Sequence, residues 1–161
     1  MLSSDKKAGK KSSQKNLKIG LACDHGGFRL KERVKKILEL KDYTTLDFGT
    51  NSTQSCDYPK LGVKLIRAML NKKIKRGILI CRSGIGYSIL ANRFKGIRAA
   101  LCCNLRAVKL SRRHNDSNVL ILAGDFIHIK DTKKFLDAWL NTDFESGRHN
   151  RRLRQIEKFS K

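Results

Sequence analysis

The chain has 161 residues, 40% of them hydrophobic, which is enough for one domain with a full core and too few for two domains of ordinary size. Even an apolar run such as Val119 to Ala123 falls far short of the roughly 20 residues that a membrane-spanning helix requires, so we expect no membrane contact. The formal net charge of +22 suits either phosphate neutralisation on a nucleic acid or a generally basic, solvated surface. The second interpretation is favoured, because Lys and Arg recur in every segment and no stripe of aromatic residues accompanies them.

Short apolar runs alternate with amphipathic segments along the chain. After a strand at 17–23, apolar side chains from Phe28 to Leu38 repeat at helical spacing, and Pro59 suits the first turn of a helix at 58–70. Further strands are expected at 44–48, 78–81, 97–102 and 119–123, and further helices at 85–93, 105–113, 132–140 and 148–159. The strands hardly alternate between apolar and polar residues, which is typical of a parallel sheet covered on both faces. We therefore predict an α/β domain, a three-layer α/β/α sandwich with a five-stranded parallel, Rossmann-like sheet.

Residues 1–16 are rich in lysine and serine and contain no apolar stretch, so we expect a disordered basic tail there, no secretory signal, and a single domain at 17–161. The five cysteines are an odd number, which argues against a disulfide framework and favours a reducing, cytoplasmic environment. Neither CxxC nor HxxxH spacing occurs, and we expect no metal ion.

Polar segments follow three of the predicted strands, at the edge where parallel α/β sheets bind their ligands. They are Asp24-His25-Gly26-Gly27, Asp47-Phe48-Gly49-Thr50 and Cys81-Arg82-Ser83-Gly84-Ile85-Gly86. Helix N-termini follow the first and the third segment, and their free amides and partial positive charge favour an anionic ligand. The third segment lacks the GxGxxG spacing of a dinucleotide site, so we do not expect a dinucleotide.

Cys81 stands directly before the expected helix at 85–93. The dipole of that helix favours a thiolate, so Cys81 would serve as a base or nucleophile beside the amides of Ser83 to Gly86, which would hold a developing oxyanion. Such a pair suits removal of a proton from a carbon next to a carbonyl. The alternative is that Cys81 is a small core residue, and the pattern alone leaves both interpretations open.

Seven motifs, in order between about residues 17 and 159, resemble those of the sugar-phosphate isomerases of the type B ribose-5-phosphate isomerase and galactose-6-phosphate isomerase group. They are Asp24-His25-Gly26-Gly27-Phe28, Asp47-Phe48-Gly49-Thr50, Asp57-Tyr58-Pro59, Cys81-Arg82-Ser83-Gly84-Ile85-Gly86 with Ala91-Asn92, Gly96-Ile97-Arg98-Ala99-Ala100, His114-Asn115-Asp116-Ser117-Asn118, and Gly147-Arg148-His149 with Arg152. Their common register makes the resemblance far more specific than any one motif.

The resemblance implies a role for each matching residue. Cys81 matches the base that moves a proton between the first two sugar carbons, and His114 matches the acid that opens the furanose ring. Ser83 and the amides of Gly84, Ile85 and Gly86 match the loop that holds the enediolate. The remaining implied substrate-binding residues are Asp24, His25, Arg82, Asn115, His149 and a phosphate clamp of Arg148 and Arg152, one helical turn apart.

The same residues also allow structural roles. His114 would close a helix at its C-terminal end, and Asp24 would cap a helix N-terminus. Arg148 and Arg152 would belong to an exposed basic helix face together with their neighbouring arginines.

The chain departs from the family pattern at three positions. Arg82 replaces a glycine, and we expect it either to alter the loop or to add positive charge near the substrate. Asp125 stands where the family often has an arginine that contacts the ligand, so it would weaken phosphate binding or pair with Arg82 or another cation. Ser83 replaces the commoner threonine and keeps the hydroxyl.

The resemblance implies an aldose-ketose isomerase of the non-oxidative pentose phosphate pathway, interconverting D-ribose 5-phosphate and D-ribulose 5-phosphate through an enediolate without a metal or organic cofactor. It also implies a homodimer or tetramer whose active sites combine residues of two subunits. Two alternatives stay open: a galactose-6-phosphate isomerase subunit, and a non-catalytic module that binds phosphosugar or RNA.

Overall fold

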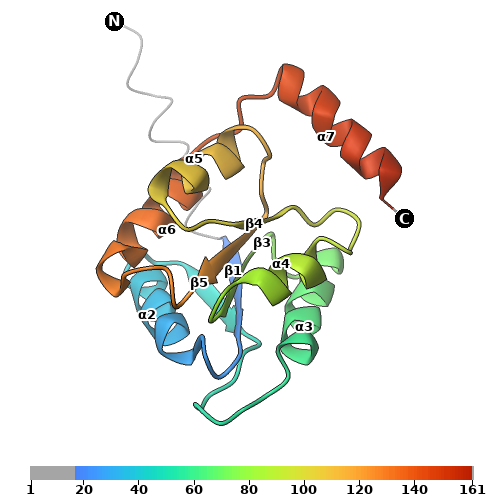
Figure 1. Cartoon of the computed structure of the whole chain (residues 1–161). Helices are drawn as coiled ribbons and strands as arrows, with labels where there is room; N and C mark the ends of the chain where they lie inside the picture. The colour runs from blue at the N-terminus through green and yellow to red at the C-terminus, as the bar shows by residue number, and fades with distance from the viewer. Residues whose placement is uncertain (1–16, 161) are drawn as a thin grey trace, which may run out of the picture.

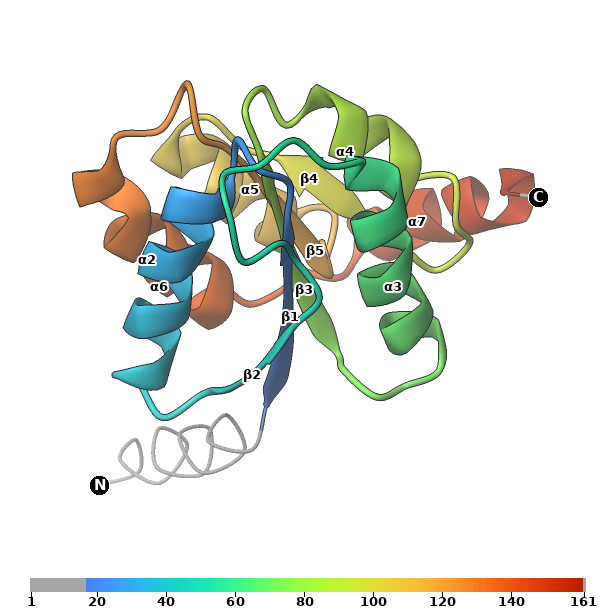
Figure 2. The same ribbon diagram turned by 90° about the horizontal axis from the view of Figure 1, so that it is seen from below.

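The computed structural model of the chain describes residues 17–160, and these form one sheet between two layers of helices (Figures 1 and 2). The five strands are all parallel and follow the order β2-β1-β3-β5-β4. They are β1 (Lys18–Cys23), β2 (Thr44–Asp47), β3 (Arg76–Cys81), β4 (Ala99–Leu101) and β5 (Val119–Ala123). The predicted α/β sandwich is confirmed, while the predicted basic tail at 1–16 lies outside the described residues.

The helices agree closely with the amphipathic segments of the sequence. They are α2 (Phe28–Glu39), α3 (Tyr58–Leu70), α4 (Ile85–Ala91), α5 (Leu105–Arg113), α6 (Thr132–Asn141) and α7 (Arg148–Phe159). A short 3-10 helix, η1 (Ile129–Asp131), precedes α6 and was not expected. Within residues 17–160, none of the helices is long and apolar enough to cross a membrane.

The core has two halves, one on each face of the sheet. Ile78 and Ile80 of β3 pack with buried side chains of α2, α5 and α6, whereas Leu79 and Cys81 pack with those of α3 and α4. Both faces of the central strands are buried, which is why these strands read as continuous apolar runs in the sequence. All five cysteines are free thiols.

Strand β4 is shorter than the predicted strand at 97–102. Gly96 takes a positive φ of 82°, so the chain turns there, and the backbone N–H of Arg98 donates to the Asn118 side chain at 2.8 Å instead of joining a strand. The helix expected to reach residue 93 ends at Ala91, because the side-chain amide of Asn92 donates to the carbonyl of Ser88. The same side chain accepts a hydrogen bond from the N–H of Ala99, and thereby ties the end of α4 to β4.

Helix α7 stands apart from the two helical layers (Figure 1). Two long contacts connect it to the segment before β4: Arg98 lies 3.7 Å from Glu157, and Lys95 donates to the carbonyl of Ser160 at 3.5 Å. Its apolar side chains Ile156 and Phe159 are 53% and 82% exposed. A helix with such an uncovered apolar face has surface available for another chain.

Candidate active site

The loops after β1 and β3 meet at the point where the strand order reverses. β2 lies on one side of β1 and β3 on the other, so the carboxyl ends of β1 and β3 flank a topological switch point. Gly27 lets the loop after β1 lie closely against β3, because a Cβ atom at this position would lie 2.3 Å from the carbonyl oxygen of Ile80. This edge carries Asp24, His25 and Cys81, as predicted.

Cys81 is the last residue of β3 and is only 5% exposed. Its Sγ accepts a hydrogen bond from the N–H of Gly84 at 3.2 Å. Burial raises the pKa of the Cys81 thiol, and the amides of Gly84, Tyr87 and Ser83 oppose this increase without overcoming it. The amides at the helix terminus thus favour a thiolate, as expected, but in the single chain desolvation outweighs them and the pKa stays raised.

Backbone groups hold the other side chains of this edge. Ser83 Oγ accepts from the N–H of Ile85 at 3.3 Å. Asp24 Oδ1 accepts from the N–H of Gly27 at 2.9 Å, which closes the turn before α2. Asp24 is thus a turn residue, and the helix N-cap is Gly27. His25 Nδ1 accepts from the N–H of Cys56 at 3.3 Å.

Arg82, the departure in the cysteine loop, packs across the neighbouring loop. A Cβ atom on Gly26 would lie 2.4 Å from Cγ of Arg82, so the arginine stem covers that glycine while the residue remains exposed. Asp125 donates its backbone N–H to the carbonyl of Arg82 at 3.0 Å. In the described part of the chain, no ion pair joins the side chains of Asp125 and Arg82, so the positive charge at this edge is not neutralised by Asp125.

His114 and the residues expected to clamp a phosphate form a second group. His114 is the C-cap of α5, as one of the structural interpretations expected, and its ring stacks on that of His149 with centroids 4.3 Å apart and planes 9° apart. His149 is 5% exposed, whereas Arg148 and Arg152 are exposed on α7. Asn115 is exposed, and its carbonyl accepts from Nε of Arg98 at 3.1 Å.

Glu145 belongs to this second group and was missed in the sequence. Its Oε2 lies 3.4 Å from Nε2 of His114 and 3.6 Å from Nε2 of His149, and Oε1 accepts from Nε of Arg113 at 2.6 Å. Its position four residues before His149 is the only local signal, since His114 lies far away along the chain. The two histidines and Glu145 offer ligand atoms within 4.8 Å of one another and have the donor types of a zinc site.

The two groups lie at opposite ends of the strands, the cysteine group at the carboxyl ends and the histidine group at the amino ends. In the β3–β5 register, Gly77 pairs with Val119 and Cys81 with Ala123, so these two ends are about 13 Å apart at 3.3 Å per residue. His114 shortly precedes β5 on the amino side, where the N–H of Asn118 donates to the carbonyl of Arg98. One chain therefore does not bring Cys81 and His114 together.

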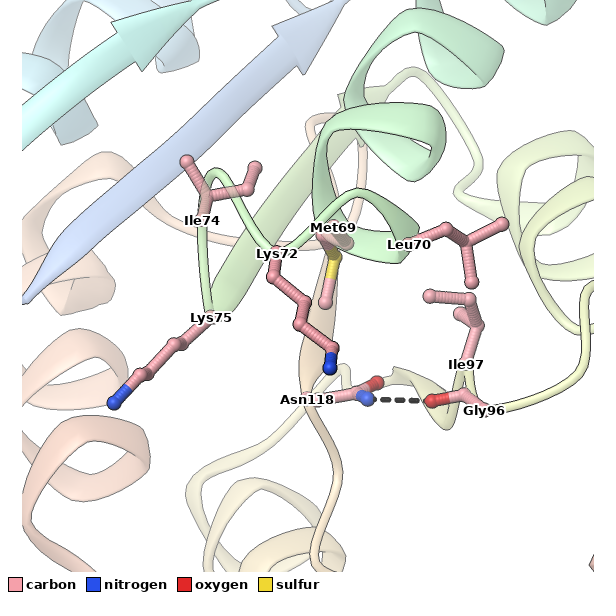
Figure 3. Close-up of a pocket in the computed structure, with 8 residues that line it drawn as sticks. All are labelled: Met69, Leu70, Lys72, Ile74, Lys75, Gly96, Ile97 and Asn118. Carbon is pink, nitrogen blue, oxygen red and sulfur yellow. Dashed lines mark hydrogen bonds between the residues drawn. The ribbon is translucent and has the colours of Figure 1, made fainter.

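A separate pocket of about 260 Å³ opens at the amino edge of the sheet (Figure 3). Its lining residues are Met69, Leu70, Lys72, Ile74, Lys75, Gly96, Ile97 and Asn118. Figure 3 shows both apolar and lysine side chains around it, and Asn118 Nδ2 donates to the carbonyl of Gly96 at 2.7 Å. None of the predicted site residues lines this hollow, so it is distinct from the cysteine site.

Comparison with known proteins identifies the family. Residues 19–156 match the family model described as Ribose/Galactose Isomerase. The chain belongs to this family. It is 40% identical over 139 residues to ribose-5-phosphate isomerase B of Escherichia coli, an alignment that covers 86% of this chain and 93% of that protein. A putative sugar phosphate isomerase of Rickettsia conorii is 43% identical over 143 residues, covering 89% of this chain and 99% of the relative.

Solved structures of relatives share the complete fold. The crystal structure of a ribose 5-phosphate isomerase from Thermotoga maritima matches with a TM-score of 0.86 at 43% identity, covering 88% of this chain and 98% of the other. Ribose-5-phosphate isomerase B of Mycoplasma genitalium, with bound ribulose-5-phosphate, matches with a TM-score of 0.83 at 34% identity, covering 89% and 95% of the two chains. The family resemblance found in the sequence is confirmed.

Proposed function

We propose that this chain is a cytoplasmic aldose-ketose isomerase that interconverts D-ribose 5-phosphate and D-ribulose 5-phosphate without a metal or organic cofactor. The observation that carries the proposal is the N–H of Gly84 directed at Sγ of Cys81, at the switch point of a sheet whose family acts on such sugars. The relatives named as ribose-5-phosphate isomerases, one of them with ribulose-5-phosphate bound, support this choice of sugar.

Cys81 acts as the base. Its thiolate takes the proton from C2 of the open-chain aldose, and the electron pair moves toward the carbonyl oxygen to form an enediolate. A proton then passes from the C2 hydroxyl to the C1 oxygen, and the thiol returns its proton to C1, which completes the ketose and regenerates the thiolate. Ser83 and the amides of Gly84, Ile85 and Gly86 stabilise the negative oxygen, and Asp24, His25 and Arg82 bind the sugar at the same edge.

His114, Asn115, His149 and the clamp of Arg148 and Arg152 serve the cysteine of a second copy. Because the two groups lie at opposite ends of the strands, a complete site requires two chains, in a homodimer or a tetramer. Exposed apolar side chains supply the surface for such contact: Ile85 and Ile89 beside the cysteine loop are 55% and 56% exposed, like those at the end of α7.

The second copy also explains how the buried thiol becomes a base. Burial raises the pKa of Cys81 in the single chain. In the shared site, Arg148 and Arg152 of the second copy place positive charge near the sulfur and lower the pKa of the thiol. His114 of that copy donates a proton to the ring oxygen as the bond between that oxygen and C1 breaks, and the C1 hydroxyl gives its proton to water as the aldehyde forms.

A second candidate sugar is galactose 6-phosphate, since the family description includes galactose as well as ribose. The non-catalytic alternative, binding of phosphosugar or RNA through the +22 charge, predicts binding without turnover.

The deciding experiment measures isomerisation of both sugar phosphates by the purified protein, its Cys81→Ala variant and the protein dialysed against EDTA. Turnover of ribose 5-phosphate that survives EDTA and disappears with the sulfur supports the proposal. Turnover of galactose 6-phosphate alone supports the second sugar, and salt-sensitive RNA binding with no turnover supports the binding module.

A further inference from the structure

The carboxylate of Glu145 joins an arginine to two stacked imidazoles. Oε1 accepts from Nε of Arg113 at 2.6 Å, and Oε2 faces Nε2 of His114 at 3.4 Å and Nε2 of His149 at 3.6 Å. Arg113 holds the pKa of Glu145 below its usual range, so the carboxylate is ionised at neutral pH. One oxygen is therefore fixed on α5 while the other is directed at the histidines.

The main chain keeps Glu145 in this position. Its N–H donates to the carbonyl of Arg113 at 2.9 Å. The next two residues, Ser146 and Gly147, have positive φ values of 61° and 56° and turn the chain sharply into α7. Glu145 thus connects the end of α5, which carries His114, to the start of α7.

The stacked rings differ in their access to solvent. The side chain of His149 is 7% exposed and that of His114 is 34% exposed. Burial and then the neighbouring His114 lower the pKa of His149, which keeps His149 neutral at pH 7. His149 supports one face of the His114 ring, and His114 is the member of the pair that can meet a substrate.

From this geometry we infer that Glu145 is the positioning residue of His114. The inference rests on the proposed function, in which His114 opens the sugar ring. A carboxylate beside one imidazole nitrogen restrains the orientation of the ring. With Glu145 beside Nε2 at 3.4 Å, Nδ1 of His114 is left to exchange a proton with the ring oxygen of the sugar.

The same three residues fit a metal ion less well. The lone pairs of imidazole lie in the ring plane, and the planes of His114 and His149 are nearly parallel, so their nitrogens do not converge on one ion. Arg113 already occupies one oxygen of Glu145. The arrangement therefore favours orientation of a histidine over coordination of zinc.

The test separates ring opening from proton transfer. Ribose 5-phosphate enters as a furanose, whereas ribulose 5-phosphate is acyclic because its C5 hydroxyl carries the phosphate. In deuterium oxide, exchange of the C1 hydrogen of ribulose 5-phosphate reports the Cys81 step alone. Turnover of ribose 5-phosphate requires ring opening in addition.

We expect Glu145→Gln to lower kcat for ribose 5-phosphate by about 10- to 100-fold, a part of the roughly 10²- to 10⁴-fold that a placed general acid contributes. KM and C1 exchange should change little, and Glu145→Asp should recover part of kcat. The matched control is Glu157→Gln, which removes another carboxylate that faces an arginine in the same region, and it should leave both rates unchanged.

The inference is overturned if Glu145→Gln lowers turnover and C1 exchange equally, if it lowers neither, or if the parent binds zinc in calorimetry and the variant does not. His114→Gln tests the proposed function separately. Full turnover in that variant means that the role of His114 has failed. Lost turnover in His114→Gln with full turnover in Glu145→Gln overturns the role of Glu145 alone.

Discussion

The N–H of Gly84 points at Sγ of Cys81 over 3.2 Å, and this contact depends on a backbone that only glycine adopts easily. Gly84 has a φ of 75°, and a Cβ atom there would lie 2.4 Å from Cδ1 of Leu101. The loop geometry and the tight packing of β4 against it thus both require glycine at this position.

Gly84→Ala should therefore lower the free energy of unfolding by about 1–3 kcal/mol and lower kcat more than it raises KM. Gly96→Ala is the matched control, because Gly96 also has a positive φ but no atom within 4 Å of an added Cβ. Urea denaturation and steady-state kinetics measure both effects. An equal loss of kcat in the two variants would show that the Gly84 amide has no special relation to the sulfur.

The clamp arginines should tune the thiol across the subunit boundary. Arg152→Gln removes a positive charge that favours the thiolate, so the pKa of Cys81 should rise and the increase of activity with pH should move to higher pH. Arg154→Gln removes the same charge from the opposite side of α7 and should leave the profile unchanged. The pH dependence of Cys81 alkylation by iodoacetamide, followed by mass spectrometry of its peptide, measures this directly. Identical profiles for the two variants would contradict a shared site.

Arg82 and Gly26 should be energetically coupled. Gly26→Ala places a methyl group against the stem of Arg82 and should destabilise the parent, whereas the same change in an Arg82→Gly background should cost less. We expect a coupling energy of about 0.5–3 kcal/mol from a double-mutant cycle of urea denaturation. Equal costs of Gly26→Ala in the two backgrounds would mean that the loop moves freely away from Arg82.

His149 should make the fold sensitive to acid. Burial, followed by the neighbouring His114, lowers the pKa of His149 in the folded chain. The unfolded chain therefore binds a proton first as the pH falls through about 6.5, so the contribution of His149 to stability is complete above that pH and is lost below it. Urea denaturation should give a smaller loss of stability on acidification in His149→Gln than in the parent. An unchanged loss would assign the acid sensitivity to other groups.

The sequence predicted the sheet well because its strands are buried on both faces. β5 (Val119–Ala123) and the helices Tyr58–Leu70 and Leu105–Arg113 have the predicted bounds, since uninterrupted apolar runs and clear amphipathic spacing mark them. β4 is an edge strand whose start depends on a side chain of another segment, Asn118, and no local pattern could reveal this.

The candidate site was predictable only in part. Motif positions indicated Cys81 and His114, but not the burial that raises the pKa of the thiol, which depends on α3 and α4 packing over that face. Glu145 was missed because its carboxylate meets His114 only after the segment before α7 folds back onto the end of α5. Contacts between distant segments such as this one leave no periodic trace in the sequence.

Complementation between two inactive variants tests the shared site most directly. Cys81→Ala and His114→Gln should each abolish turnover of ribose 5-phosphate. If subunits exchange after mixing, half of the dimers are hybrids, and each hybrid has one intact site, so about a quarter of the parental activity should return. No recovery in a mixture whose hybrid dimers are demonstrated by native mass spectrometry would contradict a site built from Cys81 of one chain and His114 of another.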